Sequence, residues 1–191
     1  MPLPHIQNSL AGREKLDPVF KSIFEVEFDI PEALRAQFEG DRHLLTEHVL
    51  TIEGLEALDK APDVSSQKFM GTDRSFINPT VGDTFADITI KFTLNLRNGT
   101  DNYIYKILRA WSRLGYNIET GERSLKKEYC ADWMKVRVAN QAGDVFREVI
   151  FKDMMMNGPL SGMGDTLDYT DNGAVELTAK FRTDWWKDLE A

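Results

Sequence analysis

The chain has 191 residues, of which 42% are hydrophobic and 28% are charged, and its formal net charge is -8. This composition is typical of a folded globular domain and excludes wholesale disorder. Proteins that bind nucleic acid neutralise phosphates with lysine and arginine, so the excess of 31 acidic over 23 basic residues argues against general affinity for DNA.

Cysteine content and hydropathy indicate the cellular compartment in which the chain is made. A single cysteine, Cys130, excludes an internal disulfide. The opening residues lack the pattern of a secretory signal, and no apolar run approaches the roughly 20 residues that span a bilayer. We therefore expect synthesis in the cytoplasm and no membrane insertion. Nothing in the chain is typical of a linker, which predicts one domain over residues 1–191.

The first half of the chain begins with residues 1–19, which are polar, contain three prolines and are predicted to form an extended N-terminal arm. In FKSIFEVEFDIP the apolar and polar residues then alternate, which predicts a strand near 22–30 that ends at Pro31. EALRAQFEGDRH favours a helical turn or two, and LLTEHVLTIEGLEAL predicts a second strand near 45–55.

The second half has a clearer pattern. DITIKFTLNLR, residues 87–97, alternates most regularly and predicts a strand, and the apolar spacing in TDNYIYKILRAWSRLGY predicts one amphipathic helix that packs on a sheet. DWMKVRVANQAGDVFREVIF predicts two strands joined by a turn near 140–144. Residues 174–186 predict one more long strand, with an apolar face and a charged face.

About six strands and one clear helix indicate a mainly β fold, a β-sandwich or barrel with one flanking α-helix. Four strands, near 22–30, 45–55, 87–97 and 174–185, are each predicted to have roughly 9–12 residues, whereas 5–6 is usual. Such strands have long edges of unpaired backbone groups, which invite pairing with another chain.

The segment 59–86 separates two of these strands and is predicted to be a long loop. Loops of this length in compact domains tend to be functional or disordered. This segment carries more apolar side chains than is usual for a linker exposed to solvent. We expect it to dock on an adjacent subunit or the next ring of an assembly. The expected docking residues are Phe69, Met70, Phe76, Ile77 and Phe85.

The sequence lacks the residue patterns typical of catalytic and metal-binding sites. One cysteine and three histidines (His5, His43 and His48) cannot form a zinc site of the usual spacing, and there is no phosphate-binding loop or serine nucleophile elbow. Glu25 and Glu27 are two residues apart on the polar face of a strand, where solvation explains them better than a glycosidase pair does. The sequence predicts no enzyme activity, no cofactor and no metal.

Four segments in order carry a resemblance to a known family. They are FEVEFDI, VLTIEGLEAL, the helix NYIYKILRAW after ITIKFTLNLRNG, and EVIFKDMMMNGPLSGMGDTLDYTDNGAVELTAKFRTDWW. Over about residues 19–188 the chain resembles the tail tube protein of contractile-tailed bacteriophages, which is similar to the tubes of R-type bacteriocins and, more distantly, of type VI secretion. Two features depart from that family: Arg182, Thr183 and Asp184 stand where aromatic residues are often found, and the segment 59–86 is long.

The resemblance implies a hexameric ring in which four strands of each subunit join one continuous barrel around a channel, with rings stacked into a tube for DNA ejection. Its implied partners are further copies of the chain, the tail sheath protein, the baseplate hub, the tape measure protein and the tail terminator. DNA would pass through the channel without specific binding, and the protein would be part of a virion tail assembled in the host cytoplasm.

In that geometry the polar strand faces would line the channel. We expect Lys91, Lys180 and Arg182 to pair across strands with acidic residues such as Glu25 or Glu176, leaving a mixed wall with an acidic excess that avoids retaining DNA. The expected channel-lining residues are Glu25, Glu27, Asp29, Glu47, Thr51, Glu53, Thr89, Lys91, Thr93, Glu176, Thr178, Lys180 and Arg182.

Three alternatives stay open at this point. The chain could form the tube of a related secretion or bacteriocin device, or it could be a tail protein, such as a terminator, that stops at a single ring. It could also be a monomeric ligand-binding β-barrel in which Trp133, Trp185 and Trp186 stack on sugars, with its charged strand faces simply exposed to solvent.

Overall fold

A computed structural model gives the fold of most of the chain. The described residues are 23–59, 64–69, 72–77, 86–96, 101–116, 120–162 and 174–190. The predicted N-terminal arm, residues 1–19, lies outside them. No helix in these ranges is long and apolar enough to cross a membrane.

Strands dominate the described residues. They are β1 (Phe24–Phe28), β2 (Val49–Glu53), β3 (Val64–Phe69), β4 (Thr72–Ile77), β5 (Ala86–Thr93), β6 (Ala131–Ala139), β7 (Val145–Met156), β8 (Glu176–Thr183) and β9 (Trp185–Glu190). The helices are α2 (Glu32–Phe38), α3 (Arg42–Glu47), α4 (Tyr103–Leu114) and α5 (Lys126–Tyr129), with the short 3-10 helices η1 (Glu39–Asp41) and η2 (Leu55–Asp59).

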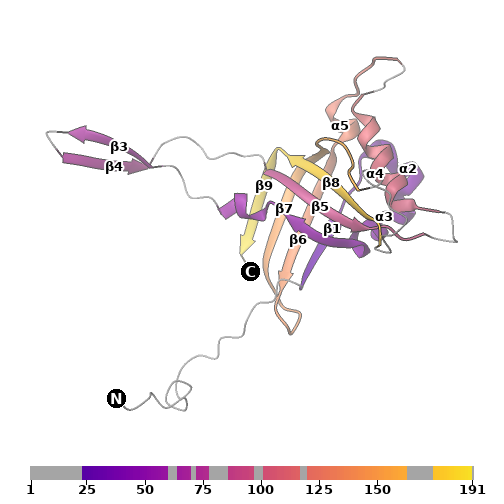
Figure 1. Ribbon diagram of the computed structural model, residues 1–191, viewed down its shortest axis with the longest axis horizontal. Coiled ribbons are helices and arrows are strands. Elements are labelled where there is room, and N and C mark those ends of the chain that lie inside the picture. Colours follow the sequence, from indigo (N-terminus) through magenta and orange to yellow (C-terminus); the bar gives the residue numbers. More distant parts are fainter. Residues whose placement is uncertain are drawn as a thin grey trace, which may run out of the picture.

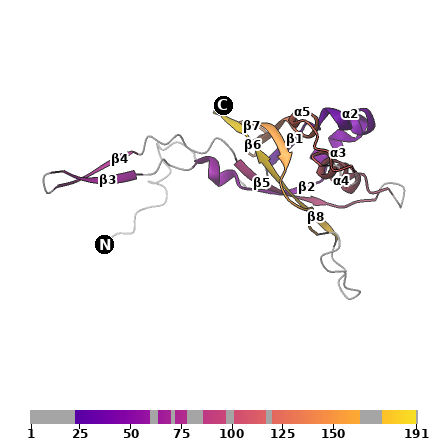
Figure 2. The ribbon, with the colours of Figure 1, turned by 90° about the horizontal axis from the view of Figure 1, so that it is seen from above.

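All strands except β3 and β4 form one antiparallel network in the order β1-β6-β7-β8-β5-β2, with β9 beside β7. The network bends into two layers (Figures 1 and 2). We call β1, β6, β7 and β9 the first sheet, and β2, β5 and β8 the second sheet. The twelve-residue β7 belongs mainly to the first sheet, but its last residues, Met155 and Met156, pair with β8 of the second.

The core fills the space between the two sheets. The Phe28 ring of β1 lies 5.9 Å from the Phe92 ring of β5 and 6.3 Å from the Phe181 ring of β8, measured between ring centres. Helix α4 closes one end, where Trp111 packs against Phe181 at 5.3 Å and donates its indole N–H to the Tyr129 carbonyl at 2.8 Å. Helices α2, α3, α4 and α5 gather at this end, while β3 and β4 lie on the far side of the sandwich (Figures 1 and 2).

The mainly β fold is confirmed, and so are the strands within 22–30 and 87–97, the amphipathic helix and the hairpin that turns near 140–144. The predicted strand lengths are wrong. The four strands expected to have 9–12 residues have 5, 5, 8 and 8, and the longest strands are β7 and β6.

Two predicted strands are interrupted. The start of the strand predicted near 45–55 belongs to helix α3, because Leu45 turns into the core against β1. The strand predicted over 174–186 divides at Asp184, where β8 ends in the second sheet and β9 begins in the first. Asp184 forms an ion pair with Lys126 at this junction, and the Thr183 hydroxyl donates to the Trp185 carbonyl.

Gly54 ends β2 in a conformation that requires glycine. Its φ is +102°, and an added Cβ would lie 2.4 Å from the Asp87 carbonyl oxygen of β5. We expect Gly54→Ala to lower the free energy of unfolding by about 2–3 kcal/mol, through backbone strain and displacement of β5. Gly40→Ala is the matched control, since no atom lies within 4 Å of its added Cβ. Equal denaturant midpoints for the two variants would contradict this expectation.

Candidate functional site

The outward face of the second sheet brings together most of the polar residues that the sequence predicted to line a channel. Along β5, Ile88, Ile90 and Phe92 are buried, whereas the residues between them point away from the core. β8 repeats this alternation. We call this outward surface the polar face. Its residues are Thr51, Glu53, Asp87, Thr89, Lys91, Thr93, Glu176, Thr178, Lys180 and Arg182.

Strand register determines which of these side chains meet. Thr89 of β5 lies opposite Glu53 of β2 and Lys180 of β8, and Lys91 lies opposite Thr51 and Thr178. The Lys91 ammonium approaches the Glu53 carboxylate diagonally, at 3.5 Å. Such exposed pairs contribute at most about 1 kcal/mol each.

Arg182 and Asp87 form the tightest ion pair of the polar face. Arg182 Nε donates to Asp87 Oδ1 and Nη2 donates to Oδ2, both at 2.8 Å. These hydrogen bonds lower the pKa of the Asp87 carboxyl. The pair therefore adds stability above the pKa of an unfolded aspartate, and this stability is lost as the pH falls through the lowered value in the folded protein.

The charges of the polar face balance. Glu53, Asp87 and Glu176 are acidic, and Lys91, Lys180 and Arg182 are basic. This face therefore has no acidic excess, whereas the predicted channel-lining set, which also included Glu25, Glu27, Asp29 and Glu47, had one. Asp87, which the sequence-based set omitted, is the residue that neutralises Arg182.

Four predicted channel-lining residues lie away from the polar face. Glu25 and Glu27 are on β1 in the first sheet, and both accept hydrogen bonds from Arg137 of β6, at 3.1 and 3.3 Å. They point outward on the opposite side of the sandwich, so the predicted pairing of Glu25 with lysines of the second sheet is wrong. Glu47 ends helix α3 instead of lying in a strand, and Asp29 is buried.

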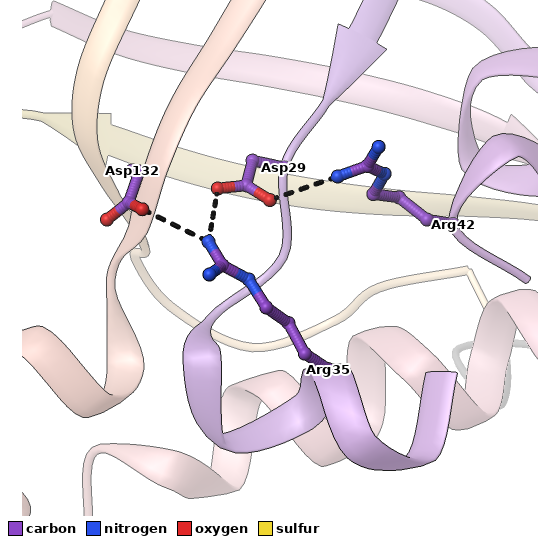
Figure 3. Close-up of polar contacts among 4 residues, drawn as sticks. All are labelled: Asp29, Arg35, Arg42 and Asp132. Carbon is purple, nitrogen blue, oxygen red and sulfur yellow. Dashed lines mark hydrogen bonds and ion pairs between the residues drawn. The ribbon is translucent and has the colours of Figure 1, made fainter. Parts of the chain in front are cut away.

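Asp29 is the buried centre of an ionic cluster whose other members reach solvent (Figure 3). It is 2% exposed and follows β1, where it accepts hydrogen bonds from Arg35 of α2 at 2.9 Å and from Arg42 of α3 at 3.4 Å. Arg35 also donates to Asp132 of β6 at 3.0 Å. The hydrogen bond to Asp132 and the charge of Asp29 raise the pKa of the Arg35 guanidinium. The cluster thus ties both helices to the first sheet.

The segment 59–86, predicted to be a loop, contains an antiparallel hairpin. β3 and β4 pair over their whole length, from Val64 opposite Ile77 to Phe69 opposite Thr72. The described side chains of this hairpin are exposed, and Phe76 is 50% exposed. Met70 and Phe85 lie outside the described residues, as do the side-chain surroundings of Phe69 and Ile77.

The reactive residue types lie apart from one another. The His48 ring contacts the Tyr103 hydroxyl at 2.9 Å, His43 is exposed, and His5 lies outside the described residues. Burial raises the pKa of the Cys130 thiol, which disfavours the reactive thiolate. No cluster of histidine, cysteine and carboxylate side chains suited to a metal occurs in the described ranges.

The fold is similar to that of chains in solved complexes of contractile injection systems. No family model matches the sequence, and no curated protein matches it. Among solved structures, the chain is similar to the tube-terminating cap of the anti-feeding prophage, at 13% identity and a TM-score of 0.60, over 94% of this chain and 95% of that one.

Two further similarities involve an extracellular contractile injection system, PVC, in its extended state. The sheath–tube complex contains a chain with 13% identity and a TM-score of 0.55, over 91% of this chain and 93% of the other. The sheath/tube terminator matches at 13% identity and a TM-score of 0.55, over 92% and 99%. At this identity the similarity establishes the fold.

Proposed function

We propose that the chain is a structural component of a contractile tail or injection device, in which copies form a hexameric ring around a central channel. The second sheet carries this proposal. One face of this sheet is buried, and the other is a charge-balanced polar surface. The fold of the chain is similar to that of chains in tube and terminator complexes. The chain acts by assembly and not as an enzyme.

The edges of the second sheet supply the means of assembly. Within the described residues, β2 is the last strand of the network and pairs on one side only. The outer side of β8 is hydrogen-bonded by the end of β7, by Asn157 and by a bridge from Ser161 to Thr178. Exposed strand edges are templates for pairing, and closing strands into a barrel removes them. In the proposed ring, β2 of one subunit lies beside the β7–β8 side of the next.

The polar face would then be the channel wall. We propose Thr51, Glu53, Thr89, Lys91, Thr93, Glu176, Thr178, Lys180 and Arg182 as its lining, joined by Asp87. Its three acidic and three basic side chains leave no net charge to hold a polyanion. A phage tube that conducts DNA without specific binding is compatible with such a wall. The further proposed partners are the sheath, the baseplate hub, the tape measure protein and the terminator.

A second candidate is a single ring that ends a tube. The similarity to a tube-terminating cap and to a sheath/tube terminator favours it. The monomeric ligand-binding barrel has less support. The space between the sheets is filled by side chains such as Phe28, Phe92 and Phe151, and one hollow of about 300 Å³ opens instead beside Phe24, Ala139 and Val145 at an end of the first sheet.

Negative-stain electron microscopy of the purified chain over a concentration series tests the proposal. We expect six-fold rings, and stacked rings or hollow tubes at the higher concentrations if the chain forms the body of a tube. Single rings at every concentration would favour the terminator. A monomer at every concentration, also after addition of a preformed baseplate or tube of the same device, would contradict the proposed assembly.

A further inference from the structure

The outward face of the first sheet combines tryptophans with lysines. Trp133 of β6, Lys152 of β7 and Trp185 of β9 lie opposite one another in one row across three strands. Lys135, two residues along β6, lies with its ammonium 4.6 Å from the centre of the Trp133 ring, and Lys187 lies two residues along β9. We call these five residues the tryptophan–lysine patch.

The lysines of this patch are not neutralised within the described residues. Lys135, Lys152 and Lys187 have no carboxylate within ion-pair distance there, although the chain as a whole is acidic. Beside the patch, Arg137 is shared by Glu25, Glu27 and Glu148 at 2.8–3.3 Å, and Glu27 also lies opposite Lys135 in the strand register. The outward face of the first sheet therefore carries an acidic cluster around Arg137 beside a basic, aromatic patch.

The patch borders an open strand edge. β9 pairs with β7 along Trp185–Glu190, and no other described strand pairs with its outer side. An edge of this kind presents free N–H and C=O groups, to which an extended peptide can add as a further strand. Side chains of such a strand that point outward would stand beside Trp185, Lys187 and Leu189, and diagonal contacts of long side chains reach the next strand, β7.

A second copy of β9 fits this edge poorly. When two identical antiparallel strands extend one sheet, residues on the same face lie opposite each other. In the two registers centred on the strand, Lys187 of one copy lies opposite Lys187 of the other, or Asp188 lies opposite Asp188. Like charges directly opposite each other destabilise a strand pair. The charge of the patch therefore favours a segment of a different protein.

We propose that β9 accepts an extended acidic segment of a partner protein as an added strand. Carboxylates of that segment pair with Lys187 and Lys152, and the methylene groups of its acidic side chains pack on Trp185, which is 46% exposed. Trp185 and Lys187 lie on the outward face of β9, so the segment has an acidic residue at every second position and all of its acidic side chains point to that face. This binding takes place on the isolated chain and does not depend on ring formation.

A soluble peptide provides the first test. The probe is a fluorescein-labelled peptide with the pattern Glu-Val-Glu-Thr-Glu-Val-Glu, and the matched probe has glutamine in place of every glutamate. Fluorescence anisotropy should show binding of the acidic peptide and at least tenfold weaker binding of the glutamine peptide. Hydrogen exchange should slow at the β9 amides that face away from β7. No binding, equal binding of the two peptides, or exchange that does not change in β9 would overturn the proposal.

Charge reversal localises the contact. Lys187→Glu and Lys152→Glu should each weaken binding of the acidic peptide roughly three- to tenfold, as expected for one ion pair replaced by a repulsive contact. Lys68→Glu, on the exposed strand β3, causes the same change in net charge far from the patch and should leave the affinity unchanged. Circular dichroism confirms folding of each variant. An equal loss in all three variants would indicate unspecific attraction and overturn the proposed site.

Discussion

Replacing Arg35 with alanine should lower the free energy of unfolding by about 2 kcal/mol. Asp29 is almost fully buried, and Arg35 donates the shorter of its two described arginine hydrogen bonds, 2.9 Å against 3.4 Å for Arg42. Without Arg35 the carboxylate keeps a weaker neutralising contact in a site that water hardly reaches. We expect less than the full cost of breaking a buried ion pair, because Arg35 is itself 40% exposed and Arg42 stays in place.

Chemical denaturation of Arg35→Ala and of a matched arginine variant measures this cost. Arg113 lies on the exposed side of α4, and Arg113→Ala should change stability by less than about 0.5 kcal/mol. A double-mutant cycle with Asp29→Ala adds a second criterion, since the two changes should be clearly non-additive. If Arg35→Ala is as stable as the control, or if the cycle is additive, the cluster does not stabilise the fold.

Arg35→Ala should affect assembly as well as stability. The chain leaves the first sheet at Asp29, passes through α2 and α3, and enters the second sheet at β2. The cluster ties both helices to β1 and β6, and thereby fixes where β2 begins. Because β2 is the open edge proposed to join the next subunit, loosening the cluster should also weaken ring formation.

The alternation of apolar and polar residues predicted the two faces of individual strands well. β5 and β8 keep the expected inward and outward faces from residue to residue, because the period of a strand depends on neighbours along the chain. The helix α4 followed equally from its apolar spacing. The break at Asp184 could not be predicted in this way, because the alternation continues through it while the pairing partner changes from β5 to β7.

The candidate site was predicted less completely, for the same reason. Alternation shows that Glu25 and Lys91 each point away from a core, but not that their strands belong to opposite sheets. Asp29 continues the outward series of β1, and its burial depends on arginines 6 and 13 residues further along, on helices that the sequence indicated only weakly. Asp87 stands at the start of a predicted strand, yet its role depends on pairing with a residue 95 positions away.

Phe76→Ser should raise the concentration needed for ring stacking or tube growth at least tenfold, on the proposal that the β3–β4 hairpin docks on a neighbouring subunit or ring. An isolated two-stranded hairpin is marginally stable in water, and this one lies well away from the sandwich (Figure 1). A half-exposed phenylalanine at its surface is the type of anchor that dominates interfaces, where losing it costs about 2 kcal/mol or more.

Leu125→Ser is the matched control for this prediction. Leu125 is 63% exposed, precedes α5 at the other end of the molecule, and loses a similar apolar side chain in the variant. Both variants should unfold at the same denaturant concentration as the unchanged protein, because neither side chain is part of the core. Sedimentation and electron microscopy then compare the assembly of the two variants. If Phe76→Ser assembles like Leu125→Ser, the hairpin is not a docking element and the apolar residues of 59–86 need another explanation.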